Sequence, residues 1–295
     1  MKKALYIGCC PEDLDLPRRF DLVARAGFQG IELDVAEHNL LWFDMTSRQL
    51  REVRSLADQH GLGITDLFCE DLWAHPITDN DETIRQRTIG RLKRTIEMAV
   101  ELGVDTCLLV PGQVNPEHGY RTVWDRSIQV LHEDLLPHCE RHHVHLAIET
   151  VWNRFLLSPI EFGHYLDQIG HPNVGVYLDC ANVMPWSYAW DWVQELGPRI
   201  TRVHLSGTRL WIYEHNDKNI VNTPGFNPLA WVNLLESDFD WGRILVPLRE
   251  AGYDGWLTID RTAYGKYYGE KPVFLMSREL DTVLEQCFSE RTSKQ

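Results

Sequence analysis

The sequence predicts a closed (β/α)8 barrel of parallel strands, and three observations support this fold class. Short apolar segments of the kind found in strands alternate eight times with helix-like segments. These strand-like segments are apolar on both faces, as in a parallel sheet that helices cover. The 295 residues also agree with the roughly 250 residues of a typical barrel of this kind. A doubly wound open sheet is the alternative, but it usually has fewer units.

The first four units are marked by helix start and stop signals as well as by apolar runs. Thr46 or Ser47 is placed to cap the second helix, and Gly61 follows its end. Gly103 ends the third helix in the same way. We expect strands over residues 3–8, 30–35, 63–68 and 105–112, followed in turn by helices over residues 16–27, 46–60, 81–102 and 120–141.

The last four units follow the same alternation. Ser158 and Pro159 open the fifth helix, with serine at the cap position and proline at the first helical position. We expect strands over residues 144–149, 174–179, 200–207 and 255–260, with helices from residue 158 onward and over residues 188–196, 240–251 and 273–288.

The connection over about residues 207–239, between strand seven and its helix, is unusually long for a compact fold. It contains Trp211, Tyr213, Phe226 and Trp231, and on this side of a barrel it would overhang the active site. A lid or binding element and an inserted interface or mobile surface segment are equally good interpretations. We expect residues 1–295 to form a single TIM-barrel domain that carries this loop insertion.

Composition excludes several classes of protein. A net charge of −14 argues against a nucleic-acid partner, because phosphate backbones are bound by clustered Lys and Arg. No apolar run approaches the roughly 18 residues of a membrane span, and the apolar run near the start is too short for a signal peptide. No P-loop or G-x-G-x-x-G motif indicates a nucleotide cofactor. Seven scattered cysteines without a C-x-x-C motif favour reduced thiols in a soluble, cytoplasmic protein.

Three carboxylates and an imidazole stand at the ends of four consecutive predicted strands: Glu149, Asp179, His204 and Asp260. The C-terminal ends of barrel strands converge on one pocket, so these side chains should meet there. Any one of the acids alone would be explained more simply as a helix cap or an ion-pair partner. Together the four predict a site for a divalent metal such as Mn²⁺, Mg²⁺, Co²⁺ or Zn²⁺.

Such a site suits proton transfer next to a carbonyl group. A metal with open positions can bind adjacent hydroxyl and carbonyl oxygens, acidify the carbon-bound proton between them and stabilise an enediolate. Glu149 and Asp260 would flank the substrate as the acid/base pair. This is the chemistry of an isomerase or epimerase acting on a ketose, keto-sugar or sugar phosphate.

Three stretches carry a resemblance to a known family: LAIETVWNRFLLSPIEF (146–162), VGVYLDCANV (174–183) and LREAGYDGWLTID (248–260). They resemble the xylose-isomerase-like TIM barrel superfamily of sugar phosphate isomerases and epimerases, and the likeness extends over nearly the whole chain from strand two on. The resemblance implies that Glu149, Asp179, His204 and, in altered form, Asp260 bind the metal. It implies that the acids of strands five and eight transfer protons, and that the chain forms a dimer or tetramer.

The chain departs from the family pattern at three places. Asp260 stands where a Glu is usual, and Asn182 stands where a D-x-x-H motif often places a substrate-contacting His. His204 is followed by Leu-Ser-Gly instead of the common x-Lys-Asp. A metal-dependent dehydratase or lyase of a keto-inositol or keto-sugar, or a catalytically degenerate sugar-binding barrel, therefore remains an alternative. The apurinic endonuclease branch is disfavoured by Asn182 and by the negative charge.

Further residues near the predicted mouth are candidates for contact with a sugar substrate. The substrate-binding candidates are Asn182, Trp152, Arg154, Trp186 and Glu70. Glu32 and Glu70 end strands two and three, where a helix cap or a supporting acid is the commoner role. Isolated cations in the loops of this side are candidate phosphate ligands, although such side chains are usually solvated: Arg209, Lys218, Arg261 and Lys266. His142, His143 and His145 lie at the beginning of strand five, at the opposite end of the barrel, where we expect no metal.

Overall fold

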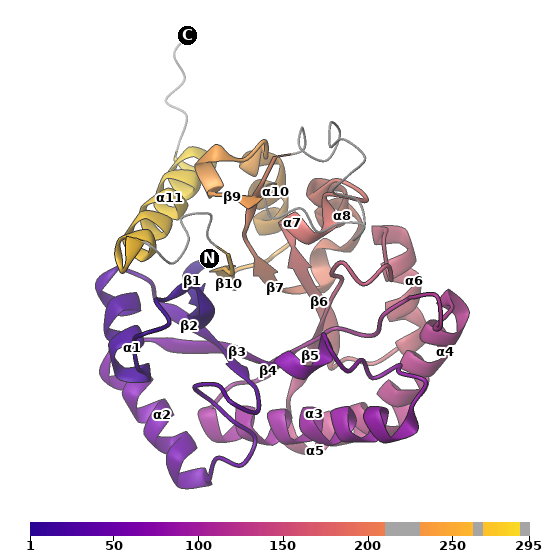
Figure 1. The fold of residues 1–295 in the computed structure, drawn as a ribbon. Coiled ribbons are helices and arrows are strands. Elements are labelled where there is room, and N and C mark those ends of the chain that lie inside the picture. The colour runs from indigo at the N-terminus through magenta and orange to yellow at the C-terminus, as the bar shows by residue number, and fades with distance from the viewer. Residues whose placement is uncertain (210–230, 262–267, 290–295) are drawn as a thin grey trace.

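The computed structural model describes residues 1–209, 231–261 and 268–289, and its eight parallel strands close into a barrel in the order β1-β10-β7-β6-β5-β4-β3-β2 (Figure 1). The predicted (β/α)8 TIM barrel is confirmed. Its strands are β1 (Lys2–Tyr6), β2 (Gly30–Val35), β3 (Gly63–Cys69), β4 (Thr106–Leu109), β5 (His145–Glu149), β6 (Val174–Asp179), β7 (Ile200–His204) and β10 (Trp256–Ile259).

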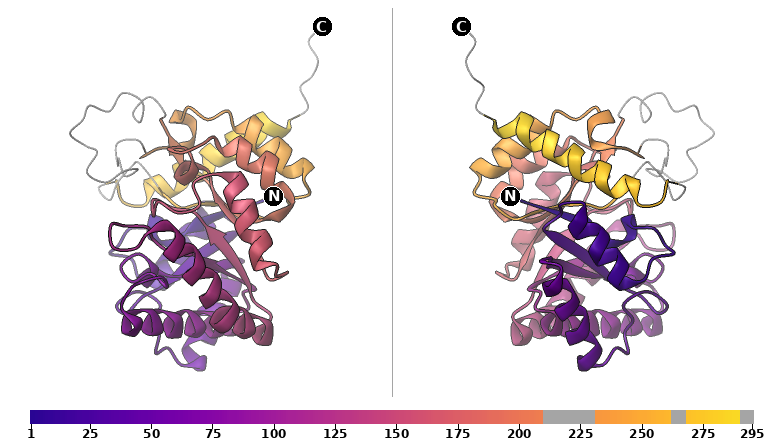
Figure 2. Two further views of the ribbon diagram at one scale, coloured as in Figure 1. Left: turned by 90° about the vertical axis from the view of Figure 1, so that its right-hand side faces the viewer. Right: turned by 90° about the vertical axis from the view of Figure 1, so that its left-hand side faces the viewer.

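The helices form an outer layer around the strands (Figure 2). They are α1 (Leu16–Arg25), α2 (Ser47–Gln59), α3 (Glu82–Leu102), α4 (Tyr120–Val130), α5 (Leu136–His142), α6 (Pro159–Ile169), α7 (Cys180–Val183), α8 (Ala189–Leu196), α10 (Trp241–Glu250) and α11 (Lys271–Phe288). No helix in the described ranges is both long and apolar enough to cross a membrane.

The predicted helix boundaries rest on caps that the structure contains. Thr46 and Gln49 form a capping box at the start of α2. Ser158 accepts a hydrogen bond from the backbone N–H of Glu161 at the start of α6. Gly103 ends α3 with φ +76°, a conformation that glycine adopts without a steric penalty.

The helix predicted over residues 120–141 contains a break in hydrogen-bond register that the sequence analysis missed. A π-helical segment over Leu131–Leu135 separates α4 from α5. The backbone N–H of Leu136 donates to Leu131, five residues back. The next residue, Pro137, has no N–H to donate, so the register changes where the proline enters the helix.

The long connection after strand seven begins and ends in an antiparallel pair. Strand β8 (Gly207–Thr208) pairs with β9 (Trp231–Val232), and a short 3-10 helix follows over Leu234–Glu236. A Cβ atom on Gly207 would come within 2.5 Å of the backbone oxygen of Asn233, so only glycine fits there. Strand seven thus ends at His204, earlier than the predicted residue 207. Trp211, Tyr213, Phe226 and Lys218 lie outside the described residues.

Candidate metal centre and active-site cavity

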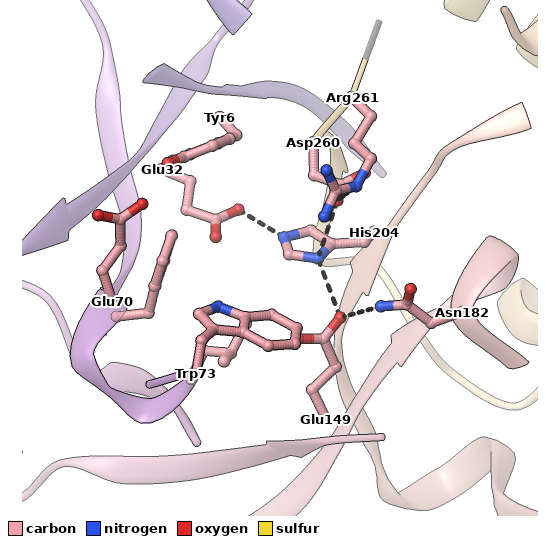
Figure 3. A pocket seen from close by; sticks show the side chains of 11 residues that line it. Tyr6, Glu32, Glu70, Trp73, Glu149, Asn182, His204, Asp260 and Arg261 are labelled. Atoms are coloured by element: carbon pink, nitrogen blue, oxygen red, sulfur yellow. Dashed lines mark hydrogen bonds and ion pairs between the residues drawn. The ribbon is translucent and has the colours of Figure 1, made fainter. Parts of the chain in front are cut away.

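A cavity of about 170 Å³ opens where the C-terminal ends of the barrel strands converge (Figure 3). Most of its lining side chains follow or end a different strand, as is usual for the active sites of this fold. The lining residues are Tyr6, Glu32, Phe68, Glu70, Trp73, Leu108, Glu149, Asn182, His204, Asp260 and Arg261.

Three of the four predicted metal ligands form a compact buried cluster. Glu149 ends β5, Asp179 ends β6 and His204 ends β7, and one ligand atom from each lies within 4.8 Å of the others. Their exposed fractions are 4%, 1% and 5%. Neighbouring parallel strands bring them together because Glu149 pairs with Tyr177 and Asp179 pairs with His204 in strand register.

Asp179 divides its two oxygens between a helix cap and the cluster. Its Oδ1 accepts hydrogen bonds from the backbone N–H groups of Ala181 (2.8 Å) and Asn182 (3.0 Å), which lie within α7. Its Oδ2 is buried and makes no hydrogen bond. Burial, followed by the negative charges of Asp260 and Glu149, raises the pKa of Asp179 well above its ordinary value.

The imidazole of His204 is held between carboxylates. Its Nε2 lies 2.7 Å from Oε2 of Glu32, and its Nδ1 lies 3.5 Å from Oε1 of Glu149 without a hydrogen-bond partner. Burial by itself lowers the pKa of His204, but the neighbouring carboxylates, led by Glu32 and Asp260, raise it well above the ordinary value. Glu32 also accepts a hydrogen bond from the Tyr177 hydroxyl (3.2 Å).

Asn182 contacts the predicted base directly. Its side-chain N–H donates to Oε1 of Glu149 over 2.9 Å (Figure 3). The sequence placed Asn182 beside the substrate, and the structure places it in the cavity wall with its amide turned toward Glu149. The amide fixes the orientation of this carboxylate from one side.

Asp260 lies at the edge of the cluster. Its Oδ1 accepts a hydrogen bond from Ser206, and its Oδ2 lies 3.7 Å from Nε of Arg261 and 4.0 Å from Nδ1 of His204. Arg261, which the sequence analysis considered only as a phosphate ligand, rests on the ring of Trp231 at 4.8 Å. The fourth predicted ligand therefore faces the cavity together with a cation.

The donor set fits a divalent cation. Asp179 Oδ2 and His204 Nδ1 are buried polar atoms without hydrogen bonds, and both belong to the three-residue cluster. Buried carboxylates that repel one another are costly unless a positive charge offsets them. Two carboxylates and one imidazole, with Asp260 nearby, match the oxygen and nitrogen donors of Mn²⁺, Co²⁺, Zn²⁺ or Mg²⁺ sites.

Of the remaining predicted substrate-binding residues, one lines the cavity and three do not. Glu70 lines the cavity, whereas Trp152, Arg154 and Trp186 are not among its lining residues. Trp152 stacks on Trp231 with ring centroids 5.4 Å apart, so it supports the wall behind Arg261. Arg154 is exposed, and Trp186 is half-buried.

Four lining residues were missed by the sequence analysis: Tyr6, Phe68, Trp73 and Leu108. Tyr6, Phe68 and Leu108 come from strands β1, β3 and β4, which belong to the half of the chain without predicted metal ligands. Their position near strand ends is the one signal that could have identified them. A side chain without a charge gives no other sign of a cavity wall in a single sequence.

Fold and site together define a TIM barrel with an acidic pocket at the C-terminal ends of its strands, and the pocket contains a cluster of side chains that could hold a metal ion. The family model described as “Xylose isomerase-like TIM barrel” matches residues 20–281, and the chain belongs to this family.

Two curated relatives share 24% identity with the chain. One is SgbU of Escherichia coli (strain K12), provisionally named an L-ribulose-5-phosphate 3-epimerase, matched over 70% of this chain and 72% of that protein. The other is 3-dehydroshikimate dehydratase of Pseudomonas putida (strain KT2440), matched over 83% of this chain. The matched region is only 36% of that longer protein.

Solved structures agree on the fold. The IolI protein with a bound zinc atom has a TM-score of 0.78 and 18% identity, covering 98% of this chain and 100% of that one. An L-ribulose 3-epimerase has a TM-score of 0.76 and 17% identity, with 99% of both chains covered.

Proposed function

We propose that the protein is a divalent-metal-dependent isomerase or epimerase of a ketose, keto-sugar or sugar phosphate. The observation that carries this proposal is the buried cluster of Glu149, Asp179 and His204 beside a cavity at the strand ends. Relatives named as epimerases of ribulose 5-phosphate and of ribulose support the substrate class.

Glu149, Asp179 and His204 would hold the metal, with Asp260 as a fourth ligand. When bound, the metal would polarise the substrate carbonyl and stabilise the negative charge that develops on its oxygen.

Glu149 is the better placed of the two proposed acid/base residues. Its Oε1 is held by Asn182, so the carboxylate is oriented before a substrate enters. It would remove the carbon-bound proton next to the carbonyl. Phe68 and Leu108 give the cavity an apolar side.

Asp260 would return the proton in an epimerisation. Ser206 donates to one of its oxygens and Arg261 lies beside the other, so the carboxylate is fixed in place. A proton delivered by Asp260 would reach the substrate from the β10 side of the cavity, away from Glu149 on β5.

The surroundings of Asp260 favour one alternative, a metal-dependent dehydratase. Ser206 donates a hydrogen bond to one oxygen of Asp260, and Arg261 lies beside the other. If these contacts keep Asp260 from delivering a proton to carbon, the enolate would instead expel a β-hydroxyl group. The dehydratase name of the Pseudomonas putida relative supports this alternative.

The test compares metal content with substrate turnover in deuterated water. The wild type is loaded with Mn²⁺ and incubated with ketoses, their phosphates and keto-inositols, and products are followed by mass and by NMR. Deuterium in an epimer or isomer supports the proposal, and loss of water from the product supports the dehydratase. Metal and sugar binding without any exchange would identify a binding barrel.

The variant Glu149→Gln keeps the shape of the side chain and removes the base. We expect turnover to fall by about 100- to 10,000-fold, the usual contribution of a general base. Glu140→Gln removes an exposed carboxylate of α5 and is the control for the loss of one charge. Equal activity of Glu149→Gln and the control would overturn the assigned role.

A further inference from the structure

A second cluster of metal-ligating side chains lies away from the barrel mouth. Glu97 on α3 and His138 and His142 on α5 bring one ligand atom each within 4.8 Å of one another. Helices α3 and α5 pack against each other on the outside of the barrel (Figure 1). His142 ends α5 just before β5 begins, whereas Glu149 stands at the other end of that strand.

The two histidines share one helix face. They are four residues apart, a spacing that places side chains one above the other on a helix. Their ring centroids are 4.5 Å apart at an angle of 44°. Nε2 of His138 lies 3.5 Å from Oε1 of Glu97 on the neighbouring helix.

The cluster is partly buried and is open to solvent on one side. The side chain of His138 is 9% exposed, whereas that of Glu97 is 41% exposed, so solvent reaches the cluster from the Glu97 side. A metal ion can therefore reach the ligand atoms from that side.

We propose that Glu97, His138 and His142 form a second site, for a divalent transition-metal ion such as Zn²⁺. Two imidazoles and one carboxylate suit Zn²⁺, Co²⁺, Ni²⁺ or Cu²⁺ and disfavour Mg²⁺ and Ca²⁺, which prefer oxygen ligands. Water would complete the coordination on the exposed side. The ion would link α3 to α5, the helices that lead into β4 and β5.

Existing contacts of His138 compete with the metal. Its Nε2 lies 3.2 Å from the backbone oxygen of Lys93, and its Nδ1 lies 3.1 Å from Nη2 of Arg141. A neutral imidazole that binds a metal through one nitrogen carries its proton on the other. Arg141 must therefore turn away whichever nitrogen binds, and because its side chain is exposed this movement meets little resistance.

A titration of the full-length protein with Zn²⁺ in excess Mg²⁺ tests the site. We expect the wild type to bind a Zn²⁺ ion that Asp179→Asn retains, because that variant alters only the barrel cluster. His142→Gln should lower the affinity for this ion by at least about 10-fold, because a loss of that size is seen even when a residue that only orients a ligand is changed. Arg141→Ala should raise the affinity for this ion by roughly two- to fivefold, the size of effect expected from one exposed charge.

His145→Gln is the matched control, because it changes an exposed histidine three residues away that is outside the cluster. It should bind Zn²⁺ like the wild type. His142 is chosen over the more buried His138 so that the variant folds, which circular dichroism would verify. The proposal is overturned if Asp179→Asn binds no Zn²⁺, or if His142→Gln and His145→Gln titrate alike. A failure of the barrel site would show separately, as a wild type that binds no more Zn²⁺ than Asp179→Asn.

Discussion

Glu32 is a buried carboxylate that can orient His204 and determine which of its ring nitrogens carries the proton. It stands on β2 and contacts Nε2 of His204 on β7. A His204 that donates its Nε2 proton to Glu32 leaves Nδ1 unprotonated beside Glu149, as a metal ligand must be. The sequence suggested a supporting acid or a cap for Glu32, and the contact with His204 agrees with a supporting acid.

Replacing Glu32 with Gln should weaken metal binding in the barrel without removing a proposed ligand. A neutral amide holds the Nε2 proton of His204 less firmly, so we expect metal affinity to fall by roughly 10- to 100-fold. Competition with a chelator measures the change. Glu70→Gln removes another acid that lines the same cavity and should leave affinity unchanged. If Glu32→Gln holds the metal as tightly as this control, Glu32 has no orienting role.

At single positions, the residues that could be predicted from the sequence are those with a metal-ligating side chain at the end of one strand after another. Glu149, Asp179 and His204 stand at successive strand ends, so their proximity could be predicted from the order of the strands alone. The contact between Arg261 and Trp231 could not be foreseen in the same way, because it joins two segments that follow different strands. The cluster of His142 with His138 and Glu97 depends on the packing of two helices, and the sequence had grouped His142 with its chain neighbours instead.

Helix α7 shows how a very short element can organise the site. Its four residues begin at the cap provided by Asp179 and include Asn182, which holds Glu149. This helix could not be predicted from the sequence, because four residues are too few to show a helical period. Longer elements were predicted to within a few residues where caps and glycines mark their ends, as for α2 and α3.

Two substitutions of Asp179 distinguish its role as the cap of α7 from its proposed role as a charged metal ligand. Asp179→Asn keeps an oxygen that can accept from the N–H groups of α7, so we expect lost metal binding with little loss of stability. Asp179→Ala loses the cap as well and should cost about 1 kcal/mol more. Urea unfolding in the presence of a chelator measures the difference. Equal stability of the two variants would show that the cap contributes nothing.

Across the whole molecule, buried acids make stability depend on pH in an unusual direction. Asp34 on β2 is 3% exposed and borders a second cavity of about 800 Å³ together with Glu70. Burial, with a further contribution from Glu70, raises the pKa of Asp34 to about 7. Between about pH 4 and pH 7 the folded state therefore binds more protons at this site than the unfolded state, and stability falls as pH rises.

Asp34→Asn should remove this part of the pH dependence. The contribution of Asp34 is fully present below about pH 4 and is lost as pH rises through 7, at a cost of at most about 4 kcal/mol. Relative to the wild type, the variant should therefore gain stability between pH 5 and pH 8 when urea unfolding is compared. Asp58→Asn, on the exposed face of α2, controls for the change in net charge. Parallel curves for the wild type and Asp34→Asn would contradict the expectation.

The closure of the barrel has a consequence for synthesis on the ribosome. Lys2 of β1 pairs with Trp256 of β10, so the first strand waits for a partner that is translated much later. At about 5–20 residues per second this delay is roughly 10–50 s. Throughout it, one edge of β1 has no barrel neighbour and can pair with another nascent chain. Asp260 emerges just after that partner, so all four proposed metal ligands are present only when the barrel is able to close.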